Sequence, residues 1–277
     1  MPTLRLTEDT VYAAQCKEKA EALYEYAMAN FGSANKDSGI YKNPVFKDEL
    51  VWAMIWLYKA TRIESYLTTA VSKYKKYSIG ELRYTSFSWK NKNPGVAILL
   101  YEETSTSGYT KDANKFMNNW LIDIERTPLG LAYALDWGPL RAAAGSAFIG
   151  LKLGDLGVKR GPFREFAMQQ IHYILGDTGR SYVVGFGNNP PQNIHHRDSS
   201  CPKTGTCNSA NALYNPKANP IILTGALTGG PDNQDYYADD RTIIEKSEVA
   251  LDYNAAFQSA VAALKHLELN GNLPTDY

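Results

Sequence analysis

The sequence predicts an all-α fold, and three observations lead to that prediction. Apolar side chains recur at helical spacing through most of the chain up to Leu175. Neither an alternation of strand and helix patterns nor a regular series of short strands is present. The predicted helices follow one another roughly every twenty to forty residues, with alternately shorter and longer connections, as helical hairpins in a ring require. The 277 residues are also enough to bury a large core.

Five helices are predicted in the N-terminal half, over residues 7–31, 48–60, 63–76, 95–103 and 112–124. In the first of them, Thr7 is suited to cap the N-terminus, and Gly32 is suited to end the helix. The second is apolar almost all round, which predicts burial on more than one side. Lysines end the third and complement the dipole there, and Pro94 suits the first turn of the fourth.

Three helices are predicted in the C-terminal half, over residues 140–153, 162–175 and 247–269. Trp137 lies in the loop before the first of these, and Gly176 ends the second. A long, mostly irregular region then reaches Lys246. Loops of that length are uncommon in compact domains unless they build a site. This region is therefore expected to contain functional residues.

Charge and hydropathy argue against two classes of partner. Lysine plus arginine equals aspartate plus glutamate, at 29 each, so neither a nucleic acid nor an anionic membrane surface is indicated. The longest apolar runs are too short to cross a bilayer. The stretch MPTLRLTEDTVYAAQ lacks the apolar core of a signal peptide, although an exported protein without its leader would look the same.

The cysteines leave two interpretations open. Cys201 and Cys207 flank the turn CPKTGTC, where a disulfide would close a small loop in an oxidising compartment. The alternative is that both are free thiols; Cys16 is the third cysteine. A structural zinc site needs four ligands, and the spacing of His195 and His196 fits no standard site. No metal site is therefore predicted.

Two segments near the C-terminus concentrate polar side chains. In residues 236–264, carboxylates lie where a loop leads into a helix, and Glu248 is expected in the first turn of that helix. The simpler explanation for such carboxylates is that they cap free N–H groups and complement the helix dipole. In residues 181–198, glycines, prolines and asparagines break regular structure just before the cluster His195-His196-Arg197-Asp198. Such a turn-rich segment lies on a surface, where loops commonly carry function.

In these two segments the sequence resembles the family 9 glycoside hydrolases, which are mostly endo-acting cellulases. The first family signature is matched by Ser181, Val183, Val184, Gly187, Asn189, Ile194, His195 and Arg197. The second is matched by Tyr237, Asp239, Glu248, Ala250, Asn254 and Ala255, and is missed at Ile244 and Ser247. Weaker similarity over residues 38–61, 84–100 and 135–149 extends the resemblance to most of the chain.

The resemblance implies an (α/α)6 toroid, in which six inner and six outer helices form a ring with the substrate cleft at one end. About eight helices are predicted here, fewer than the toroid has. Residues 1–277 are therefore expected to form a single, partial catalytic domain that corresponds to the C-terminal two-thirds of such a barrel. Its N-terminal helices are expected to be missing.

The resemblance also implies an endo-β-1,4-glucanase that cleaves cellulose and cello-oligosaccharides with inversion. Inverting glycosidases need one protonated carboxyl group to act on the leaving oxygen and one carboxylate to activate water. Glu248 is implied as the acid, and neighbouring carboxylates at Asp239, Asp240 and Glu245 are expected to help keep it protonated. Asp239 is implied as the residue that orients the site.

Substrate contacts are implied on the leaving-group side of the scissile bond. His195 is grouped with the catalytic residues. Both His195 and Arg197 would hydrogen-bond substrate hydroxyls, and Tyr253 would add a phenolic contact near the cleavage point. The remaining residues predicted to bind substrate are His196, Trp137 and Tyr84. For an aromatic residue such as Tyr84, core packing is the alternative use.

The catalytic base of the family is not found. It is an Asp of an Asp-Ala-Gly-Asp motif, and this string occurs nowhere in the 277 residues. This chain alone is therefore expected to be very slow or inactive, unless another polypeptide or another carboxylate supplies the base. The alternative function is glucan binding without turnover, or pairing with a complementary fragment. Uncovered apolar faces of an incomplete barrel would favour self-association.

No cofactor is predicted, although many relatives bind calcium. Their site uses a Ser-Gly motif just ahead of Asp-Glu-Leu. Here Ser38-Gly39 is separated from Asp48-Glu49 by a longer loop. Lys90 stands where the family has an Asp ligand, and its ammonium group repels a hard cation. The calcium site is therefore expected to be absent or altered. Separately, the family resemblance implies that the protein is secreted.

Overall fold

The structure is a computed structural model that describes residues 9–32, 43, 45–81 and 86–274. Two compact units divide the chain: unit 1 is Met1–Tyr84 with Trp89–Ala113, and unit 2 is Thr85–Ser88 with Asn114–Tyr277. The regular elements of the described residues are helices, and β-structure is confined to isolated bridges. The all-α prediction is therefore confirmed, while a single domain over residues 1–277 stays a prediction. No described helix is both long enough and apolar enough to cross a membrane.

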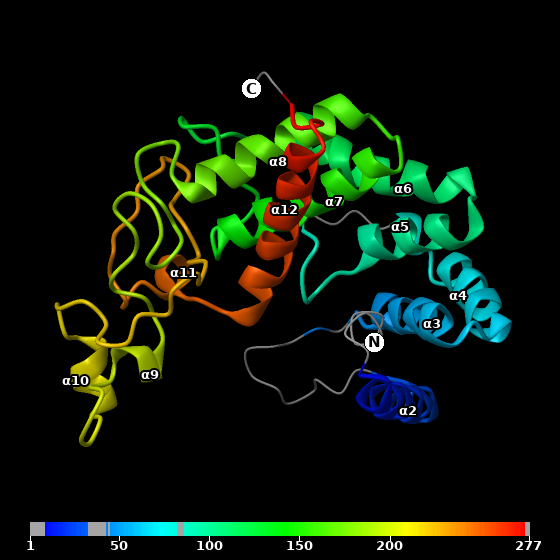
Figure 1. Cartoon of the computed structure of the whole chain (residues 1–277), viewed down its shortest axis with the longest axis horizontal. Helices are drawn as coiled ribbons and strands as arrows, with labels where there is room; N and C mark the ends of the chain where they lie inside the picture. The colour runs from blue at the N-terminus through cyan, green and yellow to red at the C-terminus, as the bar shows by residue number, and fades with distance from the viewer. Residues whose placement is uncertain (1–8, 33–42, 44, 82–85, 275–277) are drawn as a thin grey trace. The chain divides into compact units, whose positions relative to one another are not determined.

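Unit 1 is built around one central helix. Its helices are α2 (Thr10–Ala29), α3 (Lys47–Thr61), α4 (Glu64–Lys76), α5 (Asn93–Thr104) and the first part of α6 (Ser107–Asn118), with the turn η1 (Ile79–Glu81) (Figure 1). Helix α3 contacts α2, α4 and α5, and its side chains Val51, Met54 and Ile55 are fully buried. Lys59 of α3 forms ion pairs with Glu102 and Glu103 of α5. The sequence prediction that this helix is buried on more than one side is confirmed.

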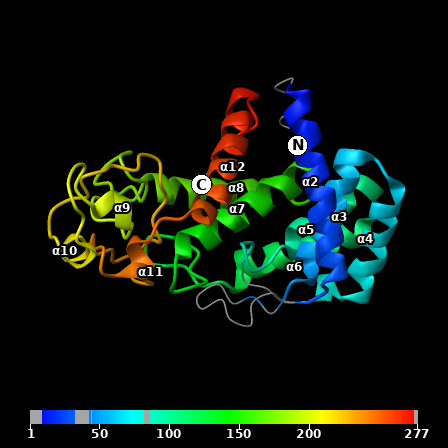
Figure 2. The ribbon, with the colours of Figure 1, turned by 90° about the horizontal axis from the view of Figure 1, so that it is seen from below.

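Unit 2 contains a helical hairpin and a third helix across it. The elements are η2 (Asn119–Asp123), α7 (Pro139–Asp155), α8 (Arg160–Leu175), α9 (Arg197–Ser200), α10 (Ser209–Leu213), α11 (Ile244–Ser247) and α12 (Leu251–Leu269). Helices α7 and α8 pack along each other, and α12 contacts both. Within this unit the short helices α9 to α11 and their loops lie at one end of the hairpin (Figures 1 and 2).

A glycine brings a connecting segment close to the hairpin. A Cβ atom at Gly145 of α7 would lie 2.5 Å from the carbonyl oxygen of Phe87, so a larger residue there would displace the Phe87 backbone. The Phe87 ring stacks on Phe148 one turn further along α7, with ring centroids 6.4 Å apart. This contact fixes Phe87, one of the residues of the segment before α5, on the surface of α7.

Most predicted helices match observed ones within a few residues, and three features differ. The predicted helix over 112–124 begins earlier, at Ser107, and ends in the π-turn η2. The predicted helix over 247–269 begins only at Leu251, because residues 248 and 249 form β-bridges instead. Thr7 lies outside the described residues, and the observed cap of α2 is Asp9, whose carboxylate accepts from Tyr12 N at 3.0 Å.

Candidate active site

Glu248 lies at the break between α11 and α12, and not in the first turn of the last helix. Its backbone is extended, with φ −60° and ψ 143°. His195 N donates to Ser247 O at 2.9 Å, and His195 and Glu248 form a parallel β-bridge. The prediction that Glu248 is helical is wrong because this main-chain pairing takes the residue out of the helix. The same pairing joins the two segments that the sequence singled out.

Two donors hold the carboxylate of Glu248. Trp137 Nε1 donates to Oε2 at 2.9 Å, and the Tyr253 hydroxyl donates to the same oxygen at 2.8 Å. Burial, and then the bond to Glu248, raise the pKa of Tyr253, so the phenol stays protonated and can donate. Since both donors reach Oε2, Oε1 is the oxygen on which a general acid would carry its proton. The sequence predicted Trp137 and Tyr253 as substrate contacts, and the structure brings both to Glu248.

The start of α7 sets the position of Tyr253. Gly138 has a left-handed backbone with φ +61°, and a Cβ atom there would lie 2.9 Å from the Tyr253 hydroxyl. Arg141, in the first turn of α7, lies over the Tyr253 ring at 5.2 Å and forms an ion pair with Asp252 at 3.2 Å. Sequence reasoning missed both residues, although the turn signal Trp-Gly-Pro at residues 137–139 is visible in the sequence.

The bond made by His195 defines its tautomer. Its Nδ1 lies 2.7 Å from the carbonyl oxygen of Arg241. A carbonyl oxygen can only accept, so Nδ1 carries the proton, and in the neutral ring Nε2 is left as an acceptor. The neighbouring histidine is used differently, because His196 Nδ1 accepts from Ser199 N at 3.2 Å and caps α9. Arg197 is exposed at the first position of that short helix.

Asp239 anchors the loop that leads to His195. Its carboxylate accepts from the main-chain N–H groups of Gln192, at 2.9 Å, and of Asn193, at 3.0 Å. The orienting role that the resemblance implies for Asp239 stays a prediction. The carboxylate of Asp240 is taken up by Thr242, whose N–H and hydroxyl both donate to it. The side chains that hydrogen-bond Glu248 are thus an indole and a phenol, and not the acidic neighbours that sequence reasoning emphasised.

Arg241 is a further residue that sequence reasoning missed. Its side chain is 3% exposed, although it stands in the charged stretch Tyr-Ala-Asp-Asp-Arg-Thr that reads as a surface loop. The guanidinium group bonds Asn193 and Asn219 and main-chain carbonyls of residues 212–217, while the Arg241 carbonyl holds His195. Tyr84, the remaining predicted site residue, lies outside the described residues.

A second group of carboxylates lies in unit 1, at the place where relatives are expected to bind calcium. Asp48 and Glu49 begin α3, and Asp48 Oδ1 and Glu49 Oε2 are buried without a hydrogen-bond partner. Two such oxygens are far fewer than the six to eight ligands that calcium takes. The Lys90 ammonium group lies over the Trp89 ring, and Ser38-Gly39 is outside the described residues. The described residues do not make a calcium site, and the altered site stays a prediction.

Comparison with known proteins gives consistent matches over nearly the whole chain. The model of glycosyl hydrolase family 9 matches residues 4–261. An endoglucanase of Dictyostelium discoideum is 38% identical, over 93% of this chain and 37% of that protein. The solved endoglucanase of the termite Nasutitermes takasagoensis is 43% identical with a TM-score of 0.84, over 89% of this chain and 57% of that chain.

A third relative has been solved with a ligand. The cellulase Cel9M of C. cellulolyticum, in complex with cellobiose, is 31% identical with a TM-score of 0.83, over 94% of this chain and 60% of that chain. The present chain therefore spans less than two thirds of the length of each of these relatives. The expected likeness to part of an (α/α)6 toroid is confirmed. The family model matches residues in both units, so the chain belongs to glycosyl hydrolase family 9.

Proposed function

We propose that this chain acts on β-1,4-linked glucans through an endo-β-1,4-glucanase site in which Glu248 is the general acid. The observation that carries the proposal is the fixed carboxylate of Glu248, with Trp137 and Tyr253 donating to one oxygen and the other oxygen left for a proton. His195 lies beside it through the main-chain bridge. Two relatives named as endoglucanases, and a related cellulase solved with cellobiose, support the substrate class.

The proposed mechanism divides the work among these side chains. Glu248 gives its proton to the leaving glycosidic oxygen, and His195 Nε2 and the Arg197 guanidinium group hydrogen-bond sugar hydroxyls on that side. Asp239 keeps the loop before His195 in place through its bonds to the main chain. Inversion also needs a carboxylate that activates water. The Asp-Ala-Gly-Asp string that would supply it is absent from the 277 residues, so we propose that turnover by this chain alone is slow.

Release of reducing sugar from carboxymethyl-cellulose tests the proposal. The chain is compared with Glu248→Gln, which keeps the shape of the side chain and removes its proton, and with Glu165→Gln, an exposed carboxyl on α8. We expect weak activity that is lost in Glu248→Gln and kept in Glu165→Gln. Activity that survives in Glu248→Gln would show that another group is the acid.

A second candidate function is glucan binding without turnover. One observation favours it. The sequence contains the residues predicted to contact substrate, but it lacks the Asp-Ala-Gly-Asp motif that would supply the catalytic base. Retardation of the chain in a gel that contains carboxymethyl-cellulose measures such binding. Retardation together with no release of reducing sugar by the wild-type chain would favour this function over hydrolysis.

We also propose that the protein acts outside the cell. The structure pairs Cys201 with Cys207 in a disulfide, with Cα atoms 5.4 Å apart, and Cys16 is a free thiol. Of the two interpretations that the sequence left open, the structure therefore has the disulfide. Disulfides persist mainly in oxidising compartments, which supports secretion.

A further inference from the structure

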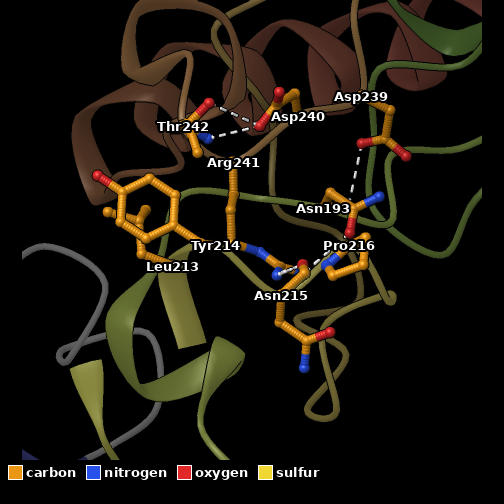
Figure 3. Close-up of a pocket in the computed structure, with 9 residues that line it drawn as sticks. All are labelled: Asn193, Leu213, Tyr214, Asn215, Pro216, Asp239, Asp240, Arg241 and Thr242. Carbon is orange, nitrogen blue, oxygen red and sulfur yellow. Dashed lines mark hydrogen bonds between the residues drawn. The ribbon is translucent and has the colours of Figure 1, made fainter. Parts of the chain in front are cut away.

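A surface pocket in unit 2 is bordered by Asp239 and by Asn193 of the loop that leads to His195. It has a volume of about 480 Å³ and is lined by Asn193, Leu213, Tyr214, Asn215, Pro216, Asp239, Asp240, Arg241 and Thr242. In Figure 3 the Arg241 side chain runs between Tyr214 on one side and Asn193 and Asp239 on the other. Neither Glu248 nor its two donors lines this pocket. The size is within the range of small-ligand sites.

The wall of the pocket is held in place by Arg241. Its guanidinium group donates to the carbonyl oxygens of Ala212 at 3.1 Å and Lys217 at 2.6 Å, and also to that of Asn215. Two further bonds reach the side-chain oxygen of Asn219, at 3.1 Å and 2.6 Å. A buried cation is costly to desolvate unless its donors are satisfied. Here most of the donors act on one loop and one reaches Asn193, so residues 212–219 have a fixed shape before any ligand arrives.

The chemistry of the lining is that of a sugar site. Tyr214 is 72% exposed, and the apolar side chains of Leu213 and Pro216 line the same pocket. A pyranose ring has an apolar C–H face that stacks on an aromatic ring and a rim of hydroxyls that need donors and acceptors. Asp240 has about four lone-pair sites, of which Thr242 occupies two. The side-chain oxygen of Asn193 bonds Arg241, which orients its NH₂ donors.

We propose that this pocket is a second carbohydrate site, which binds a segment of a β-linked glucan chain on Tyr214 at a place separate from Glu248. The ligand class rests on the proposed function, because the same polysaccharide would be held at both places. Tyr214 supplies the platform, and Asp240 and Asn193 supply hydrogen bonds to hydroxyls. Arg241 is a positioning residue, because its donors are used by the chain and not by the ligand.

Titration of the ¹⁵N-labelled Glu248→Gln chain with cellotetraose tests this inference by NMR. The backbone amides of Leu213 and Thr242 report on the pocket, and the indole N–H of Trp137 reports on the candidate active site. We expect saturable shifts of the pocket amides, with a dissociation constant that rises at least about tenfold in Tyr214→Ala, as for loss of an aromatic anchor. Tyr214→Phe keeps the ring and should bind as the parent does.

The matched control is Tyr236→Ala, because Tyr236 is 68% exposed in the same unit and does not line the pocket. This variant should bind with the parental constant. Pocket amides that do not shift, or that shift alike in the parent and in Tyr214→Ala, would overturn the inference. Failure of the proposed function is separate: it would be seen as equal carboxymethyl-cellulose hydrolysis by the wild-type chain and Glu248→Gln, whatever the pocket amides do.

Discussion

Glu248 holds its position through contacts with residues that are far away in the chain. The carboxylate is partly buried and receives hydrogen bonds from the Trp137 indole and the Tyr253 phenol. A hydrogen bond to a charged acceptor contributes about 1.5–3 kcal/mol. The phenol is in turn confined by Gly138, whose left-handed backbone and missing Cβ allow the close approach. The geometry at the candidate acid therefore depends on a residue that has no side chain of its own.

The substitution Gly138→Ala tests this dependence. We expect it to lower the free energy of unfolding by about 2–4 kcal/mol, from left-handed strain and from displacement of the Tyr253 hydroxyl. Gly157→Ala is the matched control, because Gly157 has φ +82° and no atom within 4 Å of an added Cβ. It should cost only the strain, about 1–2 kcal/mol. Urea unfolding measures both, and equal losses would show that the approach to Tyr253 is not tight.

At the scale of single residues, the sequence proposed Glu248, Asp239 and His195 because they stand in two spaced signatures. It could not identify what holds them. Trp137 is 111 residues away from Glu248, and no local pattern links the two. Arg241 was missed because a charged residue in an acidic stretch reads as exposed. Its burial follows from long-range bonds to residues 212–219, which have no signal in the sequence.

Among the helices, α3 has an unusual first turn. Acidic residues commonly begin helices because they complement the dipole, but here Asp48 is buried and Glu49 partly so. Burial, followed by the neighbouring carboxyl group of Asp48, raises the pKa of Glu49 to about 8. Asn43 donates to Glu49 Oε1 at 3.0 Å, and Lys92 N donates to Asp48 Oδ2 at 2.7 Å. At neutral pH the start of the helix is thus held partly by a protonated carboxyl group.

The thermal stability of the chain should depend on pH through Glu49. The pKa in the folded state lies above the usual value of 4.5, so the folded chain keeps a proton that the unfolded chain releases between these values. Stability should therefore fall as pH rises from about 5 to about 9. Glu49→Gln keeps a neutral side chain at every pH, and its Tm should exceed that of the wild type by a few degrees at pH 9.

The control for this prediction is Glu165→Gln, which changes an exposed carboxyl on α8 and should keep the wild-type slope. Melting curves at pH 5, 7 and 9, followed by circular dichroism, measure all three chains. A wild-type Tm that does not fall between pH 5 and pH 9, or a slope that persists in Glu49→Gln, would contradict the assignment of the proton to Glu49.

At the scale of helices, periodicity and capping residues predicted most of the elements. They failed where the chain pairs over long range. Residues 248 and 249 have the apolar and polar pattern of a helix start, yet they pair with His195 and Thr228. The three short helices α9, α10 and α11 were not predicted because four or five residues are too few to show a period.

For the molecule as a whole, one helix carries much of the exposed apolar surface of unit 1. Val11, Leu23 and Tyr26 of α2 are about 70% exposed. An apolar surface of this kind favours association with another surface. The expectation of self-association came from the general argument that an incomplete barrel leaves apolar faces uncovered. The structure points to α2 as the proposed surface for this self-association. Periodicity alone could not show this, because the exposure of α2 depends on which helices pack against it.

We predict that the chain self-associates through α2 at micromolar concentrations. The variant Leu23→Lys with Tyr26→Lys should weaken the dimer at least about tenfold, since each change removes an apolar side chain and adds a charge. Ile122→Lys replaces another exposed apolar residue, in unit 2, and should leave association unchanged. Sedimentation velocity over a concentration series measures this. A wild-type chain that sediments as a monomer throughout would contradict the prediction.

The bond between Trp137 and Glu248 also gives the site an optical signal of its own. The excited state of an indole responds to charge and to hydrogen bonding at its N–H group, and here that group lies 2.9 Å from the candidate acid. Trp137 is 42% exposed, Trp56 of unit 1 is 37% exposed and Trp120 is fully buried, so the contribution of Trp137 to the emission is the part that Trp137→Phe removes. A change in emission from Trp137 would therefore report events at the proposed reacting group without any added label.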